Sequence, residues 1–357
     1  DAMTCGFGAV VLFYMVINAA VGLRAGRMTA DLEGEVDLSV DLEEDSALDA
    51  ELDAEVGHAA GLLCGAQRVL ALTGAGLDVR LLVPAYPALT AAFPEARCVA
   101  EFPAPGGAFA PARLLEARDT LPIYLVDCPA YFARDGLYQS PAKTDWPDNH
   151  LRFGLLSRIA AILGGAGSPL AWQPHVIHCH DWQAGLTPAY LAHRDGGRVA
   201  TVMTVHNLAY QGVFPPRVLD ELGIPRGAFT IDGLEYYGNV SLLKAGLSYA
   251  TRLTTVSPTY AKEIQEPELG FGLDALLRRR GAHLTGISNG IDLAQWDPAH
   301  DAHLDHYYDA AHFEGKLCNK LALQQEFGLP MARQAPLFGV VSRLVWQKGI
   351  EIGRAHV

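Results

Sequence analysis

Short apolar runs alternate with helical patterns along most of the chain. Runs of four to eight apolar residues predict buried strands, and apolar positions spaced three and four apart predict helices that pack on them. Alternation of this kind is typical of an α/β protein with a parallel, doubly wound sheet. We expect strands at 78–84, 121–126, 176–178, 199–205, 253–256 and 337–341, and helices at 60–72, 148–163 (amphipathic), 181–193, 238–250 and from 257 onward.

The first 54 residues do not follow this alternation. An apolar run at 7–23 is slightly short for a membrane span and is broken by Asn18, so we interpret it as a buried strand or helix. It also lacks the basic start and small-residue cleavage site of a signal peptide. Residues 28–54 are acidic and free of aromatic residues, which predicts a solvated linker.

We expect the remaining domains to divide at a proline. Residues 55–334 would form one Rossmann-like domain, and the segment Gln334-Ala335-Pro336 marks its end. Residues 335–350 would then contribute the first strand of a second domain. The last seven residues, 351–357, back-translate to a common sequencing-adapter stem, so we leave them out of the fold.

Charge and cysteine content exclude several classes of protein. The formal net charge is −13, but residues 31–55 carry twelve acidic and no basic side chains, so the rest is almost neutral. Neither a nucleic acid nor an anionic membrane is therefore an expected partner. The six cysteines form no CxxC pair, which indicates reduced thiols rather than disulfides or a zinc site. We expect a cytoplasmic protein.

Four polar segments, at 178–186, 204–212, 288–292 and 341–349, are the most informative part of the chain. Their sequences are His-Cys-His-Asp-Trp-Gln-Ala-Gly-Leu, Thr-Val-His-Asn-Leu-Ala-Tyr-Gln-Gly, Ser-Asn-Gly-Ile-Asp and Val-Ser-Arg-Leu-Val-Trp-Gln-Lys-Gly. The first, second and fourth begin where an apolar strand run ends. Open α/β sheets bind ligands at the carboxyl ends of their strands, so these segments predict a binding site.

The first segment also raises the question of a metal site. Strand alternation places His178 and His180 on one face, and an H-x-H-x-D-H pattern would indicate a dinuclear metallohydrolase. In this chain Asp181 comes one position too early for that pattern and no histidine follows it. We therefore expect no metal.

The order and wording of the four segments resemble the bacterial glycogen synthase and plant starch synthase family, over about residues 77–350. The resemblance implies a GT-B fold, with two Rossmann-like domains and the active site between them. It also implies a retaining transfer of glucose from ADP-glucose to the end of an α-1,4-glucan such as glycogen, without a cofactor.

The resemblance assigns donor-side roles to residues of the last two segments. Arg343 and Lys348 would bind the donor phosphates, and an Arg fork and a Lys charge five residues apart can both face one diphosphate. Gly349 would let the backbone approach the same anion. Asn289 and Asp292 would lie in a turn near the donor, although an Asn-Gly turn is also common without a function.

Four residues of the first two segments receive roles by the same resemblance. His206 would contact the transferred glucose, and Asn207 would lie near the acceptor. Asp181 and Trp182 would line the acceptor side of the cleft. Lys244, in a run that also matches the family, is interpreted as structural.

The chain departs from the family in two places. The family's Lys-x-Gly-Gly loop corresponds to residues 55–66, where Glu55 replaces the lysine and His58 the second glycine. A carboxylate repels a diphosphate that an ammonium would attract. The second domain is almost entirely missing, so we expect a fragment that is inactive alone.

Two alternatives remain open. One is another GT-B transferase, of the sucrose synthase type, although the wording at 210–212 and 244–247 favours glycogen synthase. The other is a non-catalytic remnant that only binds glucan. The donor base, ADP or UDP, and the oligomeric state are not specified by the sequence.

Overall fold

The computed structural model describes residues 78–119, 122–195, 199–290 and 296–341. Two compact units divide the chain, and the first ends at Asn289 while the second resumes at Gly290. This division into compact units does not test the domain boundary expected at 334, which stays a prediction. The expectations for residues 1–77, including the apolar run, the acidic linker and the loop at Glu55, lie outside the described residues.

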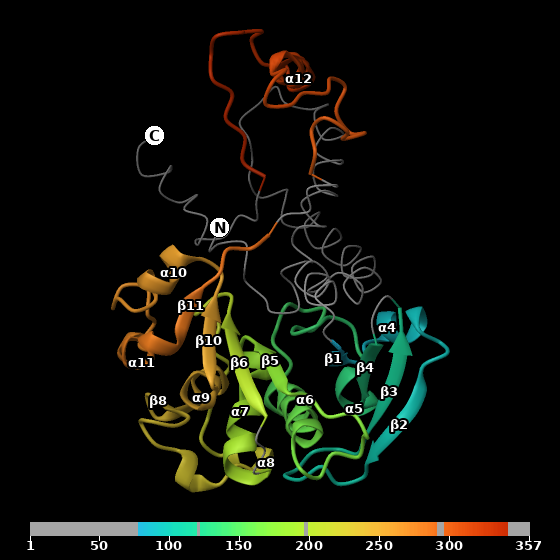
Figure 1. The fold of residues 1–357 in the computed structure, drawn as a ribbon, viewed down its shortest axis with the longest axis vertical. Helices are drawn as coiled ribbons and strands as arrows, with labels where there is room; N and C mark the ends of the chain where they lie inside the picture. Colours follow the sequence, from blue (N-terminus) through green and yellow to red (C-terminus); the bar gives the residue numbers. More distant parts are fainter. Residues whose placement is uncertain (1–77, 120–121, 196–198, 291–295, 342–357) are drawn as a thin grey trace. The chain divides into compact units, whose positions relative to one another are not determined.

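A four-stranded parallel sheet forms one half of the first unit (Figure 1). Its strand order is β11-β10-β6-β5, and all three neighbouring pairs are parallel. The strands are β5 (Val176–His180), β6 (Ala200–Val205), β10 (Arg252–Thr255) and β11 (Leu284–Gly286). The parallel arrangement predicted for the runs at 176–178, 199–205 and 253–256 is confirmed.

The other half of this unit contains a mixed sheet, where a wholly parallel sheet was expected. Its order is β1-β4-β3-β2, with β1 (Leu81–Pro84) parallel to β4 (Pro122–Asp127). The strands β2 (Arg97–Phe102) and β3 (Ala112–Arg118) are antiparallel and were not predicted. Both strands contain charged residues, so neither is a continuous apolar run. An antiparallel sheet can carry such residues, because one of its faces can stay in water.

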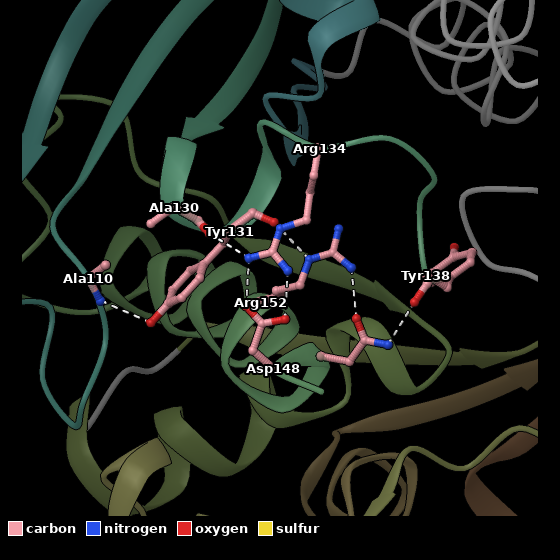
Figure 2. A network of polar contacts seen from close by, with 8 residues as sticks. Ala110, Ala130, Tyr131, Arg134, Tyr138, Asp148 and Arg152 are labelled. Carbon is pink, nitrogen blue, oxygen red and sulfur yellow. Dashed lines mark hydrogen bonds and ion pairs between the residues drawn. The ribbon is translucent and has the colours of Figure 1, made fainter. Parts of the chain in front are cut away.

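Helix α6 (Asn149–Gly164) lies between the two sheets (Figure 1). It was predicted as amphipathic, but it is buried on nearly every side. The prediction was wrong because several polar side chains of this helix are buried, and Arg152 among them is completely buried. Its Nε donates to the carbonyl of Tyr131 (2.8 Å) and its Nη1 to Oδ1 of Asn149 (2.7 Å), so the charge keeps hydrogen bonds inside the protein (Figure 2).

The loop at 133–148 is closed at its base by an ion pair. Both guanidinium Nη atoms of Arg134 donate to the carboxylate of Asp148, at 2.9 and 2.7 Å (Figure 2). The amide of Asn149 donates to the carbonyl of Tyr138 (3.0 Å) and holds the middle of the loop. These contacts connect α5 (Pro129–Phe132) to α6 across the loop.

Two of the predicted helices are more complex than expected. The helix expected at 181–193 is a 3₁₀ turn (Trp182–Ala184), then α7 (Leu186–Tyr190), then a π-helical segment (Leu191–Asp195). The one expected at 238–250 begins as strand β9 (Asn239–Ser241) before α9 (Leu242–Tyr249). The other elements of this unit are α4 (Pro87–Ala92), β7 (Val213–Phe214), α8 (Val218–Leu222), a 3₁₀ turn (Arg226–Ala228), β8 (Glu235–Tyr236), α10 (Pro258–Glu263), α11 (Asp274–Arg279) and a 3₁₀ turn (Gly281–His283). No helix in the described part of the chain is long and apolar enough to cross a membrane.

Two glycines of the sequence motifs allow α9 to approach the segment that follows β5. A Cβ at Gly185 would lie 2.2 Å from the carbonyl oxygen of Leu242, and one at Gly246 would lie 2.8 Å from Sδ of Met203. Both distances are too short for a real Cβ contact. Gly185, in the motif at 178–186, is therefore required by packing, and a side chain at Gly246, in the run at 244–247, would have to displace Met203.

We expect Gly185→Ala to destabilise the protein by about 1–3 kcal/mol, the usual effect of overpacking a tight core. The backbone of Leu242 blocks the new methyl group and cannot rotate away as a side chain would. Gly167→Ala is the matched control, since a Cβ there meets nothing within 4 Å. Urea unfolding of both variants measures the difference, and equal stabilities would show that α9 is not held this closely.

In the second unit the structure has one helix that was not predicted, α12 (Glu314–Glu326), and lacks a strand that was. The run at 337–341, expected to be a strand, has no strand pairing. Phe338 and Val340 are 87% and 79% exposed. A strand needs a hydrogen-bonded neighbour, and the described residues of this unit form no strand beside it. Apolar sequence alone was therefore an insufficient signal.

The exposed apolar run at 337–341 predicts self-association. We expect the double substitution Phe338→Ser and Val340→Ser to reduce aggregation, because it removes adjoining exposed apolar side chains. Light scattering at matched concentrations compares the variant with the parent, with circular dichroism as the control for folding. A parent chain that is already a monodisperse monomer would contradict this prediction.

Candidate functional site

The carboxyl ends of the parallel strands bring together most of the residues selected from the sequence. Asp181 follows β5, His206 follows β6, and Asn289 comes three residues after β11. Trp182 and Asn207 are the next residues along the chain from the first two. Four other predicted residues, Asp292, Arg343, Lys348 and Gly349, lie outside the described residues.

Asp181 joins the ends of β5 and β6. Its backbone N–H donates to the carbonyl of Thr204 (2.9 Å), and its Oδ1 accepts the backbone N–H of His206 (2.8 Å). The backbone N–H of Asn207 also hydrogen-bonds to the same carboxyl group. Asp181 has φ 51°, a left-handed conformation that is unusual for a residue other than glycine. The site therefore depends on a strained residue whose side chain holds the neighbouring strand end.

Burial changes the acidity of Asp181. The side chain is only 3% exposed, and the loss of hydration raises its pKa to about 7. The two backbone hydrogen bonds favour the carboxylate and oppose this rise, but they are the smaller effect. The proton is therefore held by the folded state over a pH range in which the unfolded chain has lost it.

His206 is buried at the edge of the sheet, and Asn207 shapes the loop after it. Nε2 of His206 lies 3.0 Å from Nδ1 of His180, so the ring is hydrogen-bonded across the strands. Oδ1 of Asn207 accepts the backbone N–H of Ala209 (3.0 Å) and closes a turn. The loop that leaves β6 is thus held at the carboxyl edge of the sheet by hydrogen bonds of its own polar groups.

Trp182 is a packing residue in this structure. Its ring lies 4.9 Å from Phe153 and 6.0 Å from Phe214, measured between centroids. Gly212, with φ 58°, passes so close that a Cβ would come within 2.4 Å of the indole. Trp182 thereby fixes the loop that carries His206 against the core, and whether it also contacts an acceptor stays a prediction.

Lys244 behaves as the sequence suggested. Its ammonium donates to the backbone carbonyl of Glu235, and burial lowers its pKa. Gln211 was not singled out, although it connects three segments. Its Nε2 donates to the carbonyl of Phe271 (3.0 Å), and its own carbonyl accepts the backbone N–H of Leu243 (3.1 Å). The only signal for it was its place inside the second motif.

His178 and His180 were considered as metal ligands, and the structure shows how their side chains are arranged. His178 and His180 do share a face, with ring centroids 4.2 Å apart. Among the described residues, no group of three or more His, Cys, Asp or Glu side chains is arranged to hold a metal ion.

The chain belongs to the starch synthase catalytic domain family, whose sequence profile matches residues 68–279. It is similar to the glycogen synthases of Nitrosospira multiformis (48% identity over 289 residues) and Dechloromonas aromatica (51% over 284 residues). Each alignment covers 79% of this chain and 58% of the relative. The chain thus spans less than two thirds of the length of these relatives.

A solved structure gives the same result. The catalytic domain of starch synthase IV from Arabidopsis thaliana, bound to ADP and acarbose, is similar with a TM-score of 0.62 and 28% sequence identity. The match covers 80% of this chain and 59% of that one. Together with the parallel sheet at the site, this confirms the GT-B class of glycosyltransferase fold.

The raised pKa of Asp181 makes a prediction about stability. Its contribution is fully present below the unfolded pKa, near 3.8, and is lost as the pH rises toward the folded value of about 7. Asp181→Asn keeps an oxygen acceptor for His206 but carries no charge. As the pH rises from 4 to 8, we expect the free energy of unfolding of the variant to increase by roughly 2–4 kcal/mol relative to that of the parent.

Urea unfolding of both proteins across this pH range measures the effect of Asp181. A surface carboxylate, Asp305→Asn, is the control and should leave the pH profile unchanged. A difference between Asp181→Asn and the parent that is constant from pH 4 to pH 8 would show that Asp181 titrates normally.

Proposed function

We propose that this chain is part of a glycogen synthase. The reaction transfers glucose from ADP-glucose to the non-reducing end of an α-1,4-glucan with retention of the anomeric configuration, in the cytoplasm. Support comes from the family profile, the glycogen synthase relatives and the ligands named for the starch synthase IV structure. The observation that carries the proposal most directly is the Asp181–His206 contact at the carboxyl edge of the sheet.

The described residues would bind the transferred glucose and the acceptor glucan. His206 would contact the glucose, with Asp181 holding its backbone, and Asn207 and Trp182 would border the acceptor. Glucose transfer needs its partners held in a near-attack geometry, and a buried edge with fixed polar groups provides this. Asn289 follows β11, at the other end of the same sheet, and would lie on the donor side.

The donor diphosphate would be held by Arg343, Lys348 and Gly349, with Asp292 nearby. The negative charge that develops on the leaving diphosphate is stabilised by fixed positive groups. An Arg fork and a Lys ammonium together neutralise two charges on adjacent phosphates. No metal or cofactor is needed for this step.

The test joins this chain to the part of the Nitrosospira multiformis glycogen synthase that it does not cover. We expect transfer of labelled glucose from ADP-glucose to glycogen. Arg343→Ala and Lys348→Ala should each cost about 2–4 kcal/mol in kcat/KM, the usual loss for one charge-stabilising group. His206→Ala should lower kcat more than it raises KM, while His175→Ala, an exposed residue, is the control.

The alternatives give different results. Transfer from UDP-glucose to fructose would indicate the sucrose synthase type. Binding of maltoheptaose to this chain without transfer by the joined protein would indicate a glucan-binding remnant. The proposal fails if the joined protein transfers no glucose from ADP-glucose to glycogen, if the chain does not bind maltoheptaose, or if the Arg343, Lys348 and His206 variants all stay within threefold of the parent.

A further inference from the structure

Three imidazole rings form a row across two neighbouring strand ends. His178 and His180 lie on β5, and His206 comes directly after β6. The ring centroids are 4.2 Å apart for the first pair and 5.3 Å for the second, with interplanar angles of 31° and 30°. The register pairs His180 with Thr204, two residues before His206, so all three rings lie on the same face of the sheet.

The row is connected by hydrogen bonds. Nδ1 of His180 lies 3.0 Å from Nε2 of His206, and one of these nitrogens must donate while the other accepts. The contact therefore couples the tautomers of the two rings when both are neutral. If His206 donates through Nε2, His180 must keep Nδ1 free of a proton, and the reverse holds if His180 donates.

The far end of the row is anchored by hydroxyl groups. Nε2 of His178 lies 2.6 Å from Oγ1 of Thr204, which in turn lies 2.5 Å from Oγ1 of Thr254. Thr204 is completely buried, so its hydroxyl group has a fixed place between β5 and β10. His178 cannot rotate without losing this contact, and its ring supports one side of His180.

Burial increases along the row in the direction of His206. His178 is exposed, His180 is half-buried, and His206 is only 4% exposed. The opposite face of the same strands carries the buried apolar residues Cys179, Met203 and Val205. One face of these strands thus carries polar side chains. Of the three imidazole rings on it, the most buried is that of His206, at the proposed sugar site.

We propose that His180 is a positioning residue for His206, holding its imidazole in one orientation and one tautomer through the Nδ1–Nε2 hydrogen bond. His178 and Thr204 support His180 from behind. This inference rests on the proposed function only for the role of His206 at the sugar. The hydrogen bond and its consequence for the tautomer belong to the chain itself.

The experiment compares two substitutions of His180 in the whole chain. Asn places an amide nitrogen or oxygen where the imidazole has Nδ1, so His180→Asn keeps the contact. His180→Phe keeps the ring stack and loses the hydrogen bond. Long-range ¹H–¹⁵N spectra of the histidine rings show the tautomer of His206 directly, with His206→Asn used to assign its signals.

We expect one tautomer of His206 in the parent and in His180→Asn, and an exchange-averaged mixture in His180→Phe. His175→Asn, outside the row, is the control. Should His180→Phe fail to fold by near-ultraviolet circular dichroism, His180→Ser replaces it, since a serine is too short to reach the ring. An unchanged tautomer of His206 in the Phe or Ser variant overturns the proposal.

Maltoheptaose binding, measured on the same variants, separates this inference from the proposed function. We expect His180→Phe to weaken binding roughly tenfold, the worth of about one hydrogen bond, and His180→Asn to restore it. A tautomer fixed by His180 together with no binding of maltoheptaose by the parent supports the contact and contradicts the proposed function. If His180→Phe changes the tautomer of His206 but leaves the affinity for maltoheptaose unchanged, His180 does not position His206 for binding.

Discussion

The hydrogen bond from the backbone of His206 to the carboxylate of Asp181 is the interaction on which the site depends. Parallel strands end side by side, but nothing in a sheet requires the loops beyond them to stay together. Asp181 supplies that requirement, because its backbone pairs with Thr204 while its side chain accepts from the first residue after β6. Its left-handed backbone and its buried acid both cost free energy, and strain of this kind is usual where a geometry must be held.

The same constraint extends to helix α9. The loop that leaves His206 reaches Gln211 and Gly212, whose carbonyls accept the backbone N–H groups of Leu243 and Leu242. Those are donors of the first turn of α9, which would otherwise have no partner within the helix. Gly185 lets α9 come this close. Strand end, loop and helix are thus connected by hydrogen bonds and close packing.

Periodicity predicted β5 and β6 well, because β5 begins with apolar residues, β6 consists mainly of them, and polar residues follow both strands directly. It failed where burial did not follow polarity. Helix α6 was expected to be amphipathic, yet its Arg152 is completely buried. Its guanidinium donates to Asn149 in the same helix and to the carbonyl of Tyr131, which is 21 residues away and could not be foreseen from the helix alone. Periodicity failed again at 337–341, where an apolar run has no neighbouring strand. Strand pairing depends on two segments, so the sequence of one segment cannot predict it.

The histidines of β5 show how far spacing alone can carry a chemical interpretation. The alternation of His178 and His180 was predicted correctly, and two histidines on one face are compatible with a metal as well as with a hydrogen-bonded row. What distinguishes them is the group opposite each nitrogen. Nδ1 of His180 faces His206, and Nε2 of His178 faces Thr204, which follow 26 residues later on the neighbouring strand in both cases. Each of these two nitrogens thus has its own protein partner. The register between β5 and β6 therefore decides the chemistry of the motif, and a register can only be read once both strands are in place.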